Sequence, residues 1–298
     1  MIKDLCEKLD FPQDCHDELE KALAKLLADK HTAELIMQSE ESLFEGDFRH
    51  DELLKQASDI SGIHRYTVDL VFILYCARSL KYVYANKGFS DELFYNTMRD
   101  LKCKLNECRT VHGINGIFTL KWYSRFFLCR LFALGRLEYG INEFIYDDWK
   151  NGTLKRGDLV FDCHIPSSGE PFTPDAVMDS LRTAYKFFKQ TGHLKGDIMT
   201  VVCHSYLLYP KTLQLFPENG NVRKFAALFD PVNSVEEPDN PNFWRIFGRD
   251  FPADRNFDGI ELNTTLRRNF AKYLADGKNM GLSYGVMQFD GEKIVATD

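Results

Sequence analysis

Hydrophobic residues recur at helical spacing over the first third of the chain. Between residues 13 and 108, apolar side chains are separated by three or four positions, as in LEKALAKLLADK and HTAELIMQSEESLF, which is the spacing of one helix face. Gly46, Gly62 and Gly88 separate the runs, and glycine is common just past a helix end. Ser90 precedes an acidic pair and is a natural N-cap. The pattern predicts four or five packed helices.

The pattern changes near residue 112. The stretch GINGIFTLKWYSRFFLCRLFA predicts one more helix, whereas RLEYGINEFIYDDW and DLVFDCHI contain the shorter apolar alternation typical of strands. NGTLKRGD, between those two stretches, predicts a hairpin-like turn. We therefore place a domain boundary near residue 110, with a helical domain over 1–110 and a second domain over 111–298.

The second domain contains a clear crossover pattern. Thr173 and Pro174 form a strong helix start, because threonine caps a helix and proline suits its first turn. The apolar face of this helix continues to Gln190, and the buried strand IMTVVCHSYLL follows. The order strand, loop, helix, strand lets DLVFDCHI and IMTVVCHSYLL lie parallel and adjacent.

The remaining stretches complete the fold class. NVRKFAALF opens a short helix at Asn221, FWRIF predicts a strand, TTLRRNFAKYLADG predicts a helix, and LSYGVMQF and KIVA predict closing strands. The fold class is α+β, with an all-helical N-terminal domain followed by a mixed-sheet α/β domain.

Charge and hydropathy restrict the partners. The chain has 37 basic and 44 acidic residues, a formal net charge of -7, and no basic run that can follow a phosphate backbone. We therefore expect no nucleic-acid partner. No apolar run is long enough to span a bilayer, and the charged start MIKDLCEKLDFPQD is unlike a secretory signal. We expect a cytoplasmic protein without a membrane partner; the sequence does not indicate an oligomeric state.

The eight cysteines are expected to be free, because a reducing compartment disfavours disulfides. The spacing of Cys103 and Cys108, and of Cys6 and Cys15, misses that of a zinc knuckle. Most of these thiols are expected in the core.

Cys-His occurs twice, each time where an apolar run ends. Cys163 and His164 close the first predicted strand of the crossover, and Cys203 and His204 close the second. Parallel neighbours end on one edge of the sheet, where ligands bind in open α/β folds. His164 and His204 are therefore expected to converge. Each cysteine points away from its own histidine, so we expect no metal site; a nucleophilic Cys163 or Cys203 remains an alternative.

A short polar loop follows His164. Its residues Ser167, Ser168 and Gly169 precede a helix start, and backbone N–H groups in such a position can hold a phosphate. Glu170 and Asp175 would oppose an anion. The loop predicts either an anion site or a simple turn.

Several stretches, taken in order, resemble one protein family. LFALGRLEYGINEFI, GDLVFDCHIPSSGEPFTPDAVMDSLRTAYKFF, CHSYLLYP and PENGNVRKFAALF look like the bacterial acyltransferase-domain proteins that join a helical N-acyltransferase N-terminal domain to a GNAT-like C-terminal domain. The resemblance covers most of residues 110–298, and the helical half agrees in type more than in motif. It implies a GNAT-like mixed-sheet second domain.

The resemblance also implies an acyl-CoA-dependent N-acyltransferase that uses acetyl-CoA or another acyl-CoA as co-substrate and a small-molecule amine as acceptor. The CoA pyrophosphate would lie on the loop formed by His164, Ser167, Ser168 and Gly169. The family motif Arg/Gln-x-x-Gly-x-Gly/Ala is replaced here by His-x-x-Ser-x-Gly. Ser205 is a further candidate hydrogen-bond donor to the bound group.

Acyl transfer to an amine needs a proton acceptor and an acid for the departing thiolate. His204 is the predicted acceptor, Glu138 an alternative acting through water, and Tyr209 or Tyr206 the predicted acid. Two other functions remain open: a catalytically silent GNAT-like module that binds a metabolite or partner, and a cysteine-dependent hydrolase or transferase.

Overall fold

The computed structural model describes residues 2–150, 152–238 and 242–295. Its contacts divide the chain into two compact units. The first runs to Ala133 and also takes residues Pro166–Ser168, and the second contains Leu134–Ile165 and the chain from Gly169 onward. The sequence places the domain boundary near residue 110, while the contacts divide after Ala133.

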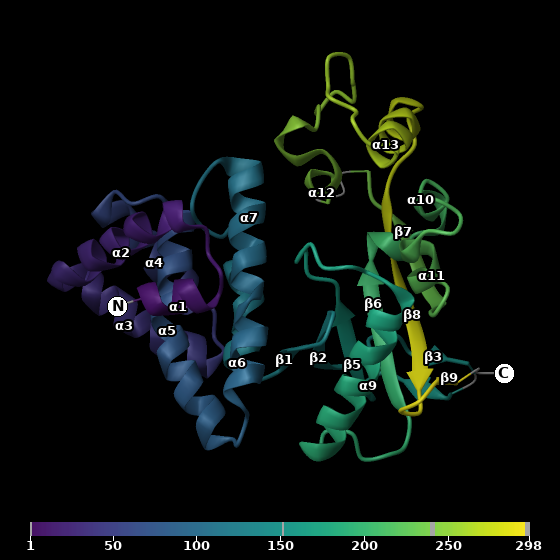
Figure 1. Cartoon of the computed structure of the whole chain (residues 1–298), viewed down its shortest axis with the longest axis horizontal. Helices are drawn as coiled ribbons and strands as arrows, with labels where there is room; N and C mark the ends of the chain where they lie inside the picture. Colours follow the sequence, from purple (N-terminus) through teal and green to yellow (C-terminus); the bar gives the residue numbers. More distant parts are fainter. Residues whose placement is uncertain (1, 151, 239–241, 296–298) are drawn as a thin grey trace. The chain divides into compact units, whose positions relative to one another are not determined.

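The first unit is helical (Figure 1). Its long helix α5 is apolar on most of its circumference and buries residues from Thr67 to Tyr84, because helices pack around it. The elements are α1 (Lys3–Lys8), α2 (Gln13–Ala28), α3 (Lys30–Glu45), α4 (Arg49–Ser61), α5 (Arg65–Asn86), α6 (Asp91–Met98), α7 (Asp100–His112), the 3-10 helix η1 (Leu120–Tyr123) and α8 (Ser124–Phe127). Strand β1 (Leu131–Leu134) spans the division between the units.

The predicted helix ends are confirmed. Gly46 and Gly62 cap α3 and α4 in the left-handed conformation, with φ of 77° and 66°, which costs glycine little. The Ser90 side chain accepts a hydrogen bond from the Leu93 amide at the start of α6. Residues 13–112 form six helices in the described chain, where the pattern predicted four or five.

The continuous helix predicted after residue 112 is wrong. The chain forms only η1 and the single turn α8 there, because it first passes close to the start of α5. The Ile117 amide donates to the Tyr66 carbonyl, and a Cβ at Gly116 would lie 2.4 Å from the Tyr66 backbone. This close approach prevents a regular helix over the segment.

The second unit is built on a mixed sheet with the strand order β2-β5-β6-β8-β7 and β9 beside β8. Strands β3 and β4 form a two-stranded antiparallel ribbon in the region of the predicted hairpin-like turn. The strands are β2 (Leu137–Glu143), β3 (Asp148–Trp149), β4 (Leu154–Lys155), β5 (Leu159–His164), β6 (Met199–Ser205), β7 (Asp230–Glu236), β8 (Gly281–Phe289) and β9 (Ile294–Val295).

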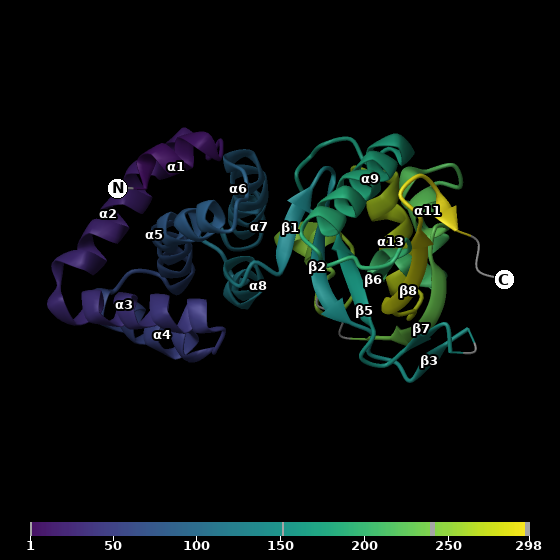
Figure 2. The same cartoon turned by 90° about the horizontal axis from the view of Figure 1, so that it is seen from below.

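The predicted crossover is confirmed. Strands β5 and β6 are parallel neighbours, paired at Phe161 with Val201 and at Asp162 with Val202. Helix α9 (Pro174–Gln190) connects them, and the Thr173 side chain caps it by accepting from the Ala176 amide. The helix lies along one face of the sheet (Figure 2), where Phe188 stacks on Phe161 with 4.1 Å between the ring centroids.

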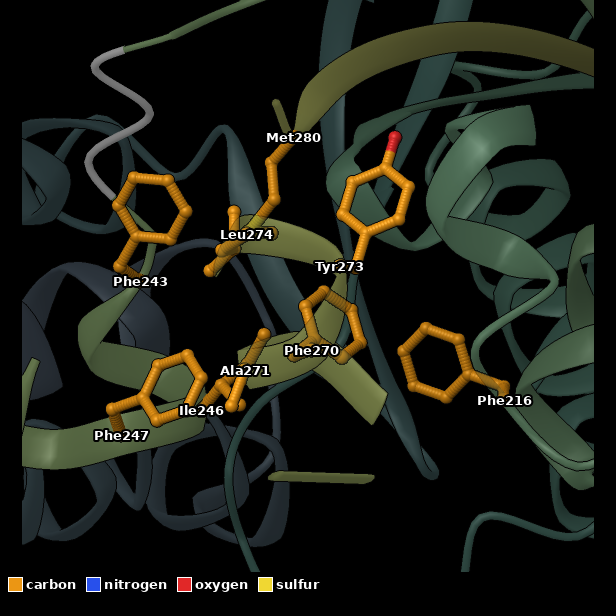
Figure 3. Packing of buried hydrophobic residues seen from close by; sticks show 9 residues of the cluster. All are labelled: Phe216, Phe243, Ile246, Phe247, Phe270, Ala271, Tyr273, Leu274 and Met280. Carbon is orange, nitrogen blue, oxygen red and sulfur yellow. The ribbon is translucent and has the colours of Figure 1, made fainter. Parts of the chain in front are cut away.

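The strand predicted for FWRIF is wrong, because this stretch forms helix α12 (Trp244–Phe247). Phe243 and Phe247 are four positions apart, so a helical turn places both on one face. They pack against Phe270 and Leu274 of α13 (Thr265–Ala275) in an aromatic cluster (Figure 3). The shorter helices of this unit are η2 (Tyr206–Leu208), α10 (Pro210–Leu213), α11 (Asn221–Ala226) and η3 (Gly248–Asp250).

No helix within the described ranges has both the length and the apolar character needed to cross a membrane.

Candidate functional site

The two faces of the sheet have different chemistry at the ends of β5 and β6. Side chains alternate along a strand, so Phe161 and Cys163 of β5 point to the face covered by α9, where Phe161 meets Phe188. Asp162 and His164 point to the other face. Each Cys-His pair is thus divided between the two faces of the sheet.

His164 has a carboxylate partner on its own strand. Its ring nitrogen Nε2 lies 2.7 Å from Oδ2 of Asp162. The side chain of Asp162 is 11% exposed and that of His164 is 30% exposed, so the pair is shielded yet reachable from solvent. Glu138 of β2 is the antiparallel pairing partner of His164 and is buried. Directly paired residues project to the same face, which adds a second carboxyl to this face.

His204 belongs to the same face. Asp162 and Val202 are paired in the parallel register, and His164 and His204 each lie two positions further along their strands, so both histidines share the face of Asp162. The imidazole of His204 is exposed. The strand register therefore places the two histidines on one face of the sheet.

A tyrosine completes the group. Tyr284 of β8 is paired with His204, and their ring centroids are 5.9 Å apart. Burial raises the pKa of Tyr284, and the nearby negative charge of Asp162 raises it further. Its phenol therefore stays protonated at neutral pH, and its ring lies beside that of His204.

The sequence analysis did not predict Asp162 or Tyr284 as site residues. The signal for Asp162 was its position two residues before His164, which places both on one strand face. Tyr284 had no local signal, because only the antiparallel pairing of β6 with β8 brings it to His204.

Tyr209 lies on the opposite face of the sheet from this group. A Cβ at Gly281 would lie 2.7 Å from the Tyr209 ring, and Gly281 is an odd number of positions from Tyr284 on β8. The Tyr209 hydroxyl is 3.3 Å from Oε2 of Glu236, to which Lys211 also donates at 2.6 Å. The structure does not bring Tyr209 together with His204.

Ser205 also points away from the histidines. It follows His204 on β6, and its hydroxyl accepts from the Leu207 amide at 3.1 Å, which caps η2. A local cap explains this serine without a ligand.

The predicted phosphate loop is anchored within the first unit. The Ser167 hydroxyl donates to Oε1 of the buried Glu107 at 2.6 Å. Ser168 is exposed, and Gly169 is exposed with a φ of 77°. Because Ser167 already has an acceptor, its hydroxyl is free to bind an anion only if that bond breaks.

All eight cysteines are free and buried. Burial raises the pKa of Cys163 well above its ordinary value, and the neighbouring Cys203 raises it further. A thiol held in its neutral form is a poor nucleophile. Within the ranges described, no cluster of three His, Cys, Asp or Glu side chains is arranged to hold a metal ion.

Two family models match the chain. Residues 131–287 match the GNAT-like C-terminal domain, and residues 1–129 match the N-acyltransferase N-terminal domain. No curated protein matches the chain.

Similar solved structures are acyltransferases. One is an acyltransferase in complex with decanoyl-CoA and teicoplanin, with a TM-score of 0.72 and 19% identity over 95% of this chain and 86% of that chain. A mutant acyltransferase in complex with octanoyl-CoA has a TM-score of 0.72 and 18% identity, with the same coverage. At this identity the likeness shows a shared fold.

Proposed function

Because this chain belongs to the family that joins an N-acyltransferase N-terminal domain to a GNAT-like C-terminal domain, we propose that it transfers an acyl group from an acyl-CoA to an amine. The observation that carries the proposal is the group formed by His204, Tyr284 and the Asp162–His164 pair on one face of the sheet. This group lies where the parallel strands β5 and β6 end, the position of ligand sites in open α/β sheets.

In this proposal the amine nitrogen attacks the thioester carbonyl carbon, a C–N bond forms, and the C–S bond breaks. His204 accepts the proton that the ammonium must lose, since its imidazole is exposed and a neutral imidazole nitrogen can accept a proton. The Tyr284 O–H donates a hydrogen bond to the departing sulfur. Tyr209 is less suited to that role, because its hydroxyl lies on the other face beside Glu236.

His164 and Glu138 support the same face. The Asp162 carboxylate orients the His164 ring, as carboxylates do for catalytic imidazoles. Glu138 is an alternative proton acceptor acting through water. Its buried position beside His164 supports a role as a second acidic group on this face of the sheet.

The donor is acetyl-CoA or a longer acyl-CoA, and the acceptor is a small-molecule amine. The decanoyl-CoA, octanoyl-CoA and teicoplanin complexes of the similar acyltransferases support this choice of donor and class of acceptor. The pyrophosphate would contact backbone N–H groups around His164, Ser168 and Gly169. The eight free cysteines support a reducing, cytoplasmic location.

A second candidate is a GNAT-like module that binds a metabolite or partner without catalysis. The hydrogen bond between Ser167 and Glu107 favours it, because this bond uses a hydroxyl of the predicted phosphate loop.

Calorimetry distinguishes the proposals at the binding step. Acetyl-CoA, octanoyl-CoA and decanoyl-CoA are each titrated into the protein. We expect at least one of them to bind in the micromolar range. Absence of binding by all three at millimolar concentration would exclude acyl transfer from CoA and leave the second candidate.

A further inference from the structure

The helical unit contains a pocket that acyl transfer does not use. It has a volume of about 620 Å³, within the usual range for small-molecule sites. It lies among the first turn of α5, the first turn of α4 and the segment 118–125, all within one unit. Its lining combines a buried carboxyl, two guanidinium groups and three aromatic rings.

The floor of the pocket has an incompletely satisfied carboxyl. The Asp69 side chain is 5% exposed, and its Oδ1 accepts from Nε of Arg65 at 2.6 Å. Its other oxygen, Oδ2, accepts no hydrogen bond from any residue that the structure describes. This oxygen belongs to a buried residue that lines the pocket, so it is available to a donor on a bound ligand.

Thr119 and Arg65 of the same pocket also have hydrogen-bonding groups that no residue in the described ranges uses. The Thr119 hydroxyl is buried and makes no hydrogen bond within the described chain. Arg65 donates from three of its five N–H groups, to Asp69 and twice to Asp51. A ligand that presents both donors and acceptors would satisfy Asp69, Thr119 and the remaining N–H groups of Arg65.

Burial raises the pKa of Asp69 to about 7, and the adjacent Arg65 opposes this rise only in part. Near neutral pH the carboxyl is thus partly protonated. A protonated carboxyl has one donor and one acceptor, which matches the edge of a nitrogen heterocycle.

The walls are flat and aromatic. Tyr66, Phe118 and Trp122 are half-buried and line the pocket. Trp122 is held in place because its indole N–H donates to Oδ2 of the buried Asp100 at 3.2 Å. Fixed aromatic rings favour a planar ligand, which they can stack against.

The rim is cationic. The Lys121 side chain is 68% exposed, and its Nζ lies 3.4 Å from Oδ2 of Asp51. Arg125 also lines the pocket. With Arg65, the lining has three cationic and two acidic side chains. An anionic group attached to the planar ligand would be attracted to this rim.

From these observations we propose that the pocket binds a planar nitrogen heterocycle that carries a phosphate, the chemistry of a purine nucleoside monophosphate. The base stacks against an aromatic wall with its polar edge toward Asp69 and Thr119, and the phosphate lies toward Lys121. The site belongs to the helical unit alone, so the proposal is independent of acyl transfer.

Calorimetry with AMP, GMP, adenosine and inorganic phosphate tests the proposal. We expect AMP or GMP to bind, and adenosine and phosphate each to bind at least about tenfold more weakly, since each lacks half of the contacts. Asp69→Ala and Thr119→Val should each weaken nucleotide binding about tenfold, the effect of one lost hydrogen bond to a buried group. Thr183→Val, at an exposed position of α9, is the matched control and should leave binding unchanged.

CoA itself contains a purine nucleotide, so the titrations are repeated with saturating CoA. Binding of AMP that survives CoA and is lost in the Thr119 variant supports the pocket. Two results would overturn the proposal: no heat from AMP or GMP at 1 mM probe (roughly the weak end of specific binding), or binding that CoA abolishes and both variants leave intact. Loss of acyl transfer in His204→Ala should not change AMP binding.

Discussion

The Asp162 carboxylate lies 2.7 Å from the imidazole Nε2 of His164, two residues further along the same strand. Both side chains project to the face that carries His204 and Tyr284. A carboxylate in this position selects the tautomer and orientation of the ring. The pair thus supplies a fixed, polar floor at the point where β5 ends.

Replacing Asp162 with Asn tests this positioning role. The amide keeps the shape but loses the charge that orients His164, so we expect kcat/KM for acyl transfer to fall about 10- to 100-fold. A positioning role predicts that most of the loss is in kcat, with little change in KM. An unchanged kcat would contradict the role.

The two histidines should differ in their contributions. His204→Ala removes the proposed proton acceptor and should reduce kcat by about 100-fold or more. His164→Ala should have a smaller effect, similar to that of Asp162→Asn, because the proton goes to His204 in this proposal. Steady-state kinetics with one acyl-CoA and one amine measure both, and an equal effect of the two changes would assign them a shared role.

Gly281→Ala tests the packing around Tyr209. A Cβ there would lie 2.3 Å from the Val235 carbonyl oxygen and 2.7 Å from the Tyr209 ring. We expect a destabilisation of about 2 kcal/mol or more, typical of overpacking against backbone. Gly196→Ala is the control, because no atom lies within 4 Å of its Cβ position. Chemical denaturation of both variants measures the difference; similar stabilities would contradict the packing.

Asp69 should make stability depend on pH. Its pKa in the folded protein is about 7, raised by burial, whereas an unfolded Asp titrates near 3.9. Between these values the folded protein retains a proton that the unfolded chain has released. The free energy of unfolding therefore falls as pH rises from about 4 to about 7, and the contribution levels off above pH 7.

The Asp69→Asn variant should lose this part of the pH dependence. The difference in unfolding free energy between the variant and the natural protein should change by up to about 4 kcal/mol across the window. Urea denaturation at pH 4 and pH 8 measures it. A difference that does not change with pH would contradict the raised pKa.

The thiols of Cys163 and Cys203 should resist alkylation. Both are buried, and burial raises the pKa of Cys163 well above its ordinary value. Iodoacetamide at neutral pH should leave both unmodified in the folded protein and modify both in urea. Fast labelling of either thiol in the folded state would contradict this prediction and would support a cysteine-dependent hydrolase or transferase.

Local signals made much of the fold predictable. The caps at Ser90 and Thr173 act within three residues, and the crossover of β5, α9 and β6 follows from the order of elements and chain handedness. The parallel pairing that carries His164 and His204 was predictable for the same reason.

Nonlocal packing limited the rest. FWRIF is a short apolar run that fits either a strand or a buried helix, and the aromatic cluster around Phe270 decided for the helix. Likewise Tyr209 follows His204 closely in sequence, yet the chain turns at η2 and places it against Gly281 on the opposite face. Tyr284 reaches His204 only through the pairing of β8.

Acyl transfer by this protein can be measured as release of free CoA from decanoyl-CoA in the presence of a panel of small amines. We expect amine-dependent release by the natural protein and a loss of about 100-fold or more in His204→Ala, with decanoyl-CoA binding retained in the variant. Binding of decanoyl-CoA without amine-dependent release by the natural protein, or equal release by His204→Ala, would contradict this expectation.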